Sequence, residues 1–327
     1  MPHGPRILSI WAAALASIVV GSIALHAQQP AAQVGTRWTE TQIREAIAPV
    51  RAGRTLVPTS WPGGNRVAVC ISFDVDTETW DLARGGDAPV SLSAGEFGAR
   101  QGMPRILDML DRHSIPASFY VPAVSAMLHP DIVASIAKSR RHEIGVHGWI
   151  HESLPALNDA AEEERLLRQS VDYLTKVAGK RPAGYRAPSW ALSRFTANQL
   201  ARSGFLYDSS MMAMDVPYEL VLDGKPSGLI ELPVEWILDD APYFSRTGAL
   251  PAPELIFRVY RDEFDAAYAE GSYYMLTMHP RVIGHRSRMN HLEELIGYMR
   301  SKPGVWFATA EQIASHIKAT VMSRPPQ

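Results

Sequence analysis

From Arg66 onward, short apolar runs alternate with longer amphipathic segments. The apolar runs are rich in β-branched and aromatic residues, which predicts buried strands in RVAVCISF (66–73), PASFYVP (116–122), EIGVHG (143–148), AGYRAP (183–188), FLYDSS (205–210), LIELPVEW (229–236), SYYMLTMHP (272–280) and VWFATA (305–310). Apolar positions at helical spacing predict helices over residues 103–113, 131–140, 159–179, 193–204, 252–271, 288–300 and 310–319. Because strands alternate with helices, we expect βα units, a parallel sheet and a barrel-like α/β domain.

The N-terminal segment has a different pattern. MPHGPR carries one arginine, residues 7–25 are apolar, and HAQQPAAQ is small and polar. This order is typical of a secretory signal peptide, residues 1–27, cleaved after Ala27. The apolar run also reaches the length of a membrane span, so an uncleaved anchor stays open. In both cases we expect the rest of the chain to be exported, periplasmic or extracellular, with a linker and lead-in over 28–65 and the α/β domain over 66–320.

Composition narrows the classes of function. The chain has 327 residues, of which 46% are hydrophobic and 20% charged, so it can bury a core. The formal net charge is -2 and no dense Lys/Arg tract occurs, so we expect no nucleic-acid partner. The single cysteine, Cys70, lies in the first apolar run and is interpreted as a core residue without an internal disulfide partner.

Five of the predicted strands end in side chains of the kinds that enzymes use. These side chains are Asp74 and Asp76, His147 and His151, Arg186 and Trp190, Glu235 and Trp236, and His279. In α/β folds, ligands bind at the carboxyl ends of the parallel strands. We therefore expect these side chains to converge on one site.

A metal centre is the first chemistry that this pattern predicts. His147 and His151 are four residues apart, and on a helical turn that spacing places both imidazoles on one face. Together with one aspartate they form the donor set of a catalytic metal site with open positions for water and substrate. The donors favour Zn²⁺, and Co²⁺, Mn²⁺ or Fe²⁺ would also bind them.

Acid–base catalysis is the second chemistry that this pattern predicts. Asp74 and Asp76 lie just beyond a strand, where one can bind the metal and the other can act as base for the metal-bound water. Either could instead only cap the following turn. Arg186 suits a charge partner that orients the base, and His279 suits the general acid that protonates the leaving group.

The motifs SFDVD, HGWIH, RAPSW, LPVEW and MHP, in this order, resemble the polysaccharide deacetylases (carbohydrate esterase family 4, the NodB homology domain). The resemblance spans residues 66–315 and implies a distorted (β/α) barrel of about seven or eight parallel strands. It also implies metal-dependent removal of acetyl groups from N-acetylated sugars. By position it implies one role for each of six residues: Asp74 as base, Asp76, His147 and His151 as metal ligands, Arg186 as the arginine that orients the base, and His279 as acid.

One departure from the family pattern leaves the substrate open. Val75 separates two aspartates that are usually adjacent, and residues 95–107, 239–244 and 278–289 resemble a branch with peptidoglycan-deacetylase-like and allantoinase- or cyclic-imidase-like members, which tend to oligomerise. The substrate is then an N-acetylated glycan or a small amide, and a non-catalytic carbohydrate-binding relic is the third alternative. Six further residues are weaker candidates, of second rank, for lining the substrate pocket: Glu78, Arg100, Trp190, Trp236, Asp240 and Tyr243.

Overall fold

The computed structural model describes residues 34–244 and 251–323, and these divide into two compact units, one ending at Arg44 and one beginning at Glu45. In the first unit a 3₁₀ turn, Val34–Arg37, precedes the start of helix α1 (Glu40–Ile47), no residue of which is buried. The predicted signal peptide, residues 1–27, lies outside the described residues. None of the described helices is both long and apolar enough to cross a membrane.

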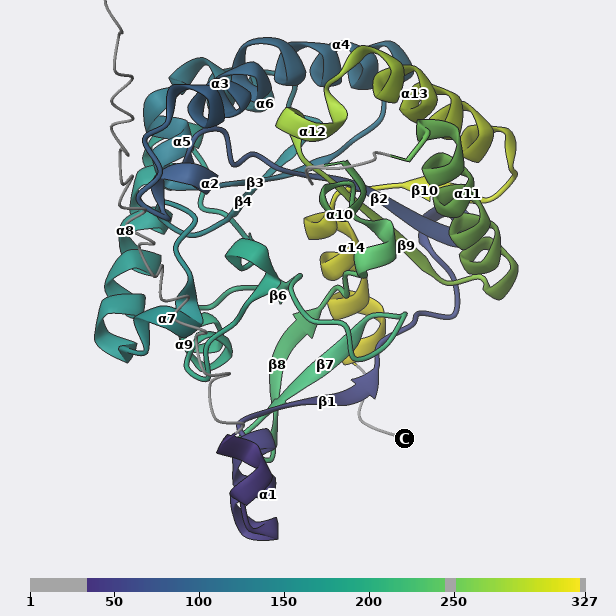
Figure 1. Cartoon of the computed structure of the whole chain (residues 1–327). Helices are drawn as coiled ribbons and strands as arrows, with labels where there is room; N and C mark the ends of the chain where they lie inside the picture. The colour runs from purple at the N-terminus through teal and green to yellow at the C-terminus, as the bar shows by residue number, and fades with distance from the viewer. Residues whose placement is uncertain (1–33, 245–250, 324–327) are drawn as a thin grey trace, which may run out of the picture. The chain divides into compact units, whose positions relative to one another are not determined.

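A curled ten-stranded sheet forms the centre of the second unit (Figure 1). Its strands are β1 (Val50–Thr55), β2 (Val67–Asp74), β3 (Ser118–Val121), β4 (Glu143–Val146), β5 (Gly184–Tyr185), β6 (Tyr207–Asp208), β7 (Tyr218–Leu222), β8 (Lys225–Glu231), β9 (Tyr273–Met278) and β10 (Val305–Phe307). The order is β1-β7-β8-β6-β5-β4-β3-β2-β10, and β9 pairs with β2. All eight apolar runs contain or overlap a strand, although β8 begins four residues before its run and ends within it, and the pairings among these strands are parallel.

Two strands were not predicted, and both pair antiparallel. β7 lies between β1 and β8, so β1 brings part of the predicted lead-in, residues 28–65, into the sheet. The ordered sheet therefore begins before Arg66. β1 could not be recognised in the sequence because VRAGRT is polar and only partly buried, as an edge strand can be. Among the described residues β8 and β9 share no ladder, so the distorted barrel has a seam there.

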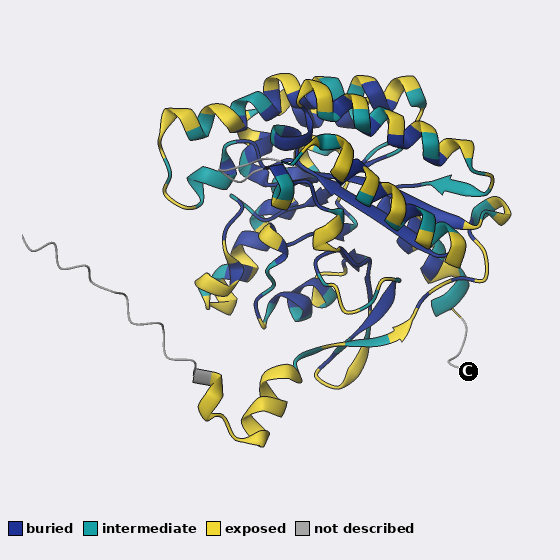
Figure 2. Ribbon diagram, turned by 45° about the vertical axis from the view of Figure 1, so that its right-hand side comes forward, coloured by how far each residue is buried: buried dark blue, intermediate teal, exposed yellow. Residues whose placement is uncertain are grey.

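Helices cover the outer side of the curled sheet (Figure 1). The helices of this unit are α2 (Thr79–Leu82), α3 (Pro89–Phe97), α4 (Met103–His113), α5 (Ala123–Leu128), α6 (Pro130–Lys138), α7 (Leu154–Leu157), α8 (Ala160–Ala178), α9 (Thr196–Arg202), α10 (Ala241–Phe244), α11 (Pro253–Glu270), α12 (Pro280–Ile283), α13 (Arg286–Ser301) and α14 (Ala310–Ile317). Of these, α14 packs against the other face of the sheet, with Ala68 and Cys70 of β2. The seven predicted helices of the domain are all present. Figure 2 shows their exposed residues facing outward and their buried residues facing the sheet, as amphipathic segments require.

The core continues through the sheet because the strands are buried on both faces. Every residue of β2 is buried. Gly184 in β5 leaves the space that the Tyr207 ring fills, since a Cβ at this position would lie 1.9 Å from the ring. The Tyr207 hydroxyl in turn donates to Glu143 at 2.6 Å. The strands are therefore fixed closely enough to position side chains at their ends.

Candidate active site

The carboxyl ends of four strands bring the six predicted catalytic and metal-binding residues together. Each of the six is buried, with Asp74 and Asp76 at the end of β2, His147 and His151 after β4, Arg186 after β5, and His279 after β9. Val75, between the two aspartates, donates its N–H to the Tyr120 carbonyl at 2.8 Å, which continues the pairing of β2 with β3. The inserted valine is thus an extension of the strand that carries both acids.

Asp76, His147 and His151 form a compact set of donors. One ligand atom from each lies within 4.8 Å of the other two. Asp76 Oδ1 is 3.5 Å from His147 Nε2 and 3.8 Å from His151 Nε2. This oxygen is buried and meets no hydrogen-bond donor among the described residues, although buried carboxylate oxygens are normally paired. Two imidazoles around an unpartnered carboxylate oxygen fit a divalent metal.

The ionisation of these residues also suits a metal. Burial lowers the pKa of His151 to about 4, so this imidazole is neutral at neutral pH and keeps a lone pair. For Asp76, burial acts to raise the pKa, but His151 and His147 outweigh burial and the net shift is downward. His147 Nδ1 lies 2.8 Å from the Arg186 carbonyl, so Nδ1–H donates there and Nε2 faces Asp76.

The two histidines lie in a loop after β4, so it is not a helical turn that brings residues of this spacing to one face. Gly148 and His151 have φ of 73° and 65°, which no helical turn allows. The Glu152 carboxylate holds the loop, because it accepts from the Trp149 N–H at 2.9 Å and from the Ile150 N–H at 2.8 Å. Sequence analysis missed Glu152, whose only signal was its position beside the HGWIH motif. A buried carboxylate therefore replaces the helix in bringing the imidazoles together.

Arg186 is fully buried and orients Asp74. Nη1 donates to Asp74 Oδ1 at 2.8 Å, while Nε and Nη2 donate to the Ser209 carbonyl and hydroxyl at 3.0 and 2.9 Å. Burial acts to lower the pKa of Arg186, but Asp74 outweighs burial and the net shift is upward. The other oxygen, Asp74 Oδ2, is left facing His147 Nε2 at 3.8 Å and His279 Nε2 at 4.0 Å.

His279 is held by two carboxylates. Its backbone N–H donates to both oxygens of Asp240 at 3.1 Å, and Nδ1 lies 2.7 Å from Asp240 Oδ1 and 3.5 Å from Asp239 Oδ1. Burial acts to lower the pKa of His279, but Asp239 and Asp240 raise it well above its ordinary value. Nε2 faces Asp76 Oδ2 at 3.9 Å. Asp240 thus contacts His279 directly, and Asp239, which sequence analysis missed, was signalled only by the DD doublet.

Two of the residues predicted to line the pocket, Glu78 and Arg100, pair with other side chains of the protein. Glu78 lies 2.8 Å from His129 Nε2, and both side chains are largely buried. Arg100 is exposed and pairs with Glu96 one turn before it. The structure therefore does not bring Arg100 into contact with the six buried residues.

Aromatic residues of the second rank gather near the ends of β5 and β8. Trp190, which is buried, packs on the half-exposed Trp236 with ring centroids 4.3 Å apart. The Tyr243 hydroxyl donates to the Ile237 carbonyl at 3.3 Å. The two indoles could contact a substrate through the exposed ring of Trp236.

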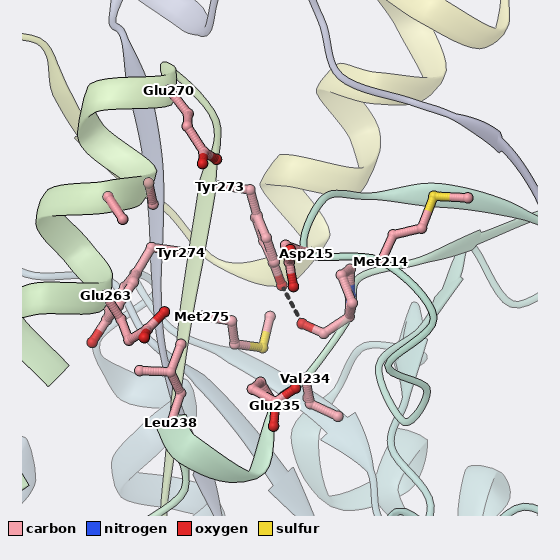
Figure 3. A pocket seen from close by; sticks show the side chains of 13 residues that line it. Met214, Asp215, Val234, Glu235, Leu238, Glu263, Glu270, Tyr273, Tyr274 and Met275 are labelled. Atoms are coloured by element: carbon pink, nitrogen blue, oxygen red, sulfur yellow. Dashed lines mark hydrogen bonds between the residues drawn. The ribbon is translucent and has the colours of Figure 1, made fainter. Parts of the chain in front are cut away.

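A surface pocket at the seam between β8 and β9 is separate from this cluster (Figure 3). It is lined by acidic, aromatic and sulfur side chains that include Asp215, Glu235, Glu263, Glu270, Tyr273 and Met275. None of the six buried residues lines it. Met275 Sδ nevertheless accepts from Arg186 Nη2 at 2.8 Å, so one side chain lies between the pocket and the cluster.

Comparisons with known proteins agree with this geometry. The polysaccharide deacetylase family model matches residues 87–207. The peptidoglycan deacetylase of Helicobacter pylori is 30% identical over 280 residues, 76% of this chain and 95% of that protein. A crystal structure from Mycobacterium smegmatis, assigned to the polysaccharide deacetylases, has a TM-score of 0.74 and 38% identity, covering 85% of this chain and all of that one. The structure of Puue allantoinase has a TM-score of 0.71 and 27% identity, covering 80% and 93%.

Proposed function

This chain belongs to the polysaccharide deacetylase family of hydrolytic deacetylases, and from that premise we propose that it removes acetyl groups from N-acetylated amino sugars of peptidoglycan or a related polysaccharide. The observation that carries the proposal is the meeting of a base, three metal donors and an acid at one edge of the sheet. The choice of polymer is supported by the Helicobacter pylori relative, which is a peptidoglycan deacetylase.

The proposal includes a divalent metal, zinc by preference, held by Asp76, His147 and His151. Its support is the unpartnered oxygen of Asp76 and the mixed nitrogen and oxygen donor set. When bound, such an ion polarises the amide carbonyl and makes water nucleophilic at neutral pH. Co²⁺, Mn²⁺ and Fe²⁺ accept the same donors.

The proposed base and acid face the same small site and transfer protons in turn. Asp74 takes the proton of the attacking water at Oδ2, because Oδ1 is bound to Arg186. His279 gives a proton from Nε2 to the departing amine nitrogen, while Asp240 accepts the Nδ1–H and stabilises the imidazolium. The two proton-carrying atoms lie 4.0 Å apart, so both transfers take place in one small site.

A second candidate is hydrolysis of a small cyclic amide, of the imide or allantoin type. The likeness to Puue allantoinase favours it, and the same base, donors and acid serve ring opening. A non-catalytic binding role is the third alternative. A binding role alone would not require the buried Asp74–Arg186 ion pair, the three metal donors or the pairing of His279 with Asp240.

We further propose that the protein is exported and acts as a homo-oligomer. Export is supported by the order of charged, apolar and small residues over 1–27. N-terminal sequencing of the protein from a fractionated culture should give a start at Gln28 if Ala27 is the cleavage site. Light scattering of the purified protein measures its oligomeric state.

The test is a substrate panel on purified protein with measured metal content. We expect acetate release from N-acetylated glucosamine oligomers or peptidoglycan, loss of activity on chelation, and recovery when Zn²⁺ is added back. Ring opening of allantoin or a cyclic imide without acetate release would favour the second candidate. Bound glycan with no product from any substrate would support the binding role and contradict the proposal.

A further inference from the structure

An arginine without a carboxylate partner lies beside the donor set. Arg84 follows helix α2, and its guanidinium carbon lies 3.7 Å from the centroid of the Trp80 ring. Nη1 donates to the Trp80 carbonyl at 2.6 Å, which anchors one end of the guanidinium. Among residues 34–244 and 251–323, no carboxylate lies within ion-pair distance of Arg84, and Nε and Nη2 donate to no residue.

Trp80 connects this arginine to the site. The Trp80 ring meets the His151 imidazole edge-on, with centroids 5.0 Å apart. One indole therefore separates the guanidinium of Arg84 from a donor residue, and cation–π stacking fixes the guanidinium there. The rest of the guanidinium is left for a partner outside the protein.

A second arginine approaches the same ring from another strand end. Arg281, two residues after His279, lies 5.9 Å from the Trp80 centroid. It differs from Arg84 in having an acidic partner, Asp81, at 3.3 Å. The two guanidinium groups on one indole repel each other. Asp76 and Asp81 attract Arg84 through space, but of the two arginines only Arg281 has a carboxylate within ion-pair distance among the described residues. An anion at this point would relieve that repulsion.

We propose that Arg84 forms an anion subsite, and that the substrate carries a carboxylate close to the amide that is hydrolysed. A guanidinium binds a carboxylate through charge-assisted hydrogen bonds, and Nε and Nη2 are the donors that remain. The inference rests on the proposed hydrolysis of an N-acetylated sugar and adds the charge of its substrate. Among the sugars of peptidoglycan, a lactyl carboxylate distinguishes N-acetylmuramic acid from N-acetylglucosamine.

The experiment compares one sugar in two charge states. N-acetylmuramic acid and its lactyl methyl ester are offered to the metal-loaded wild type, Arg84→Gln, Arg84→Lys and Arg168→Gln. Arg168 is an exposed arginine on α8 and serves as the matched control. N-acetylmuramoyl-L-alanyl-D-isoglutamine, which carries its carboxylate on the peptide, distinguishes a peptide carboxylate from a lactyl one.

We expect Arg84→Gln to lower kcat/KM for the free acid about 10- to 100-fold, mainly through KM, and to leave the ester within about twofold. Arg84→Lys should retain part of the preference, and the preference of the wild type should shrink as salt is raised. Arg168→Gln should match the wild type. An equal loss on acid and ester would show that Arg84 only supports the loop, and no loss on either carboxylate substrate would also overturn the subsite.

A binding measurement separates this inference from the proposed function. Calorimetry on metal-free protein should show tighter binding of N-acetylmuramic acid than of its ester, and Arg84→Gln should abolish the difference. If no N-acetylated sugar is hydrolysed but this difference is present, the deacetylase proposal fails and the subsite stands. If acetate is released and neither acid nor ester is preferred, the subsite fails and the deacetylase proposal stands.

Discussion

Two pairs of buried acids lie at strand ends of this sheet, and they are neutralised in opposite ways. Asp74 and Asp76, after β2, are surrounded by Arg186 and three histidines. Asp208 and Glu231 lie opposite each other at the ends of β6 and β8, and no cation forms an ion pair with either within the described chain. Carboxyl groups at the same edge of the sheet therefore have two different surroundings.

The second pair is satisfied without a cation. Glu231 Oε1 accepts from the N–H groups of Ser210 and Met211 at 2.9 and 3.0 Å, and Asp208 Oδ1 accepts from the Ser210 hydroxyl at 2.8 Å. The remaining oxygens, Oδ2 of Asp208 and Oε2 of Glu231, are buried without another donor, so a proton held between the two carboxyl groups satisfies both. Burial raises the pKa of Asp208 to about 6 and that of Glu231 well above its ordinary value.

The difference shows which buried acid is prepared for chemistry. The pKa of Asp76 is lowered, so this carboxylate keeps its charge and its unpartnered oxygen suits a bound cation, and Asp74 is oriented by an arginine whose burial is costly. The second pair keeps its own proton and needs no ligand. Burial alone therefore does not identify the site, and the surrounding cations do.

The largest expected effect separates the two pairs by activity. Asp74→Asn should lower kcat by about 10²- to 10⁴-fold, because the proposed base is removed. Asp208→Asn, the matched change in the second pair, should alter kcat by no more than about fivefold, since Asp208 donates and accepts no proton of the substrate. Acetate release at saturating substrate measures both variants, with metal content determined for each. Similar losses in the two variants would contradict the assignment of Asp74 as base.

The next largest effect is the loss of stability when the positive charge of Arg186 is removed. Arg186→Met leaves Asp74 buried and unpaired, and should lower the free energy of unfolding by about 3–5 kcal/mol. Urea unfolding of the metal-free protein gives this value. The double variant Arg186→Met/Asp74→Asn should recover much of the loss, because the uncompensated charge is gone. An additive double variant would show that the arginine stabilises the fold by packing alone.

A smaller effect is expected from the loop that carries the histidines. Glu152→Ala removes the acceptor of the Trp149 and Ile150 N–H groups, and should weaken metal affinity about 10- to 100-fold. Competition with a chelator of known affinity measures it. Glu163→Ala is the control, since Glu163 is also a buried glutamate but binds Ser193 and Thr196 instead. Equal metal affinity in wild type and Glu152→Ala would remove Glu152 from the site.

The smallest effect concerns the pH dependence of stability. Because the folded pKa values of Asp208 and Glu231 are raised, the stability that the pair contributes is complete below an ordinary carboxyl pKa near 4 and falls as pH rises through about 6. Glu231→Gln removes one of the two titrating groups, and its amide can donate to Asp208. Urea unfolding at pH 5 and pH 8 should show a decrease for the wild type that is on the order of 1 kcal/mol larger than for the variant. A steeper decrease in the variant would contradict the shared proton.

The sequence predicted more of the fold than of the geometry around the site. Each apolar run became a strand and each of the seven helical patterns in the domain became a helix, because period and burial are local properties of the chain. The polar edge strand β1 escaped detection, since its pairing with β7 depends on a segment that follows it by more than 160 residues. The loop that brings His147 and His151 together could not be predicted from their spacing, because it depends on the positive φ of Gly148 and on the Glu152 carboxylate.

By itself, the sequence determined which residue types stand at the ends of the strands, and the resemblance to the deacetylases assigned them roles. Only the tertiary structure decided which acids meet cations and which share a proton. Asp74 and Asp208 both end buried strands, and the residues beside them do not show which cation or carboxyl group each will meet in the fold. The distinction comes from the parallel order of the sheet, which brings Arg186 to Asp74 across more than 100 positions and brings Glu231 to Asp208. Electrostatic energies depend on distances in space, and the fold sets those distances.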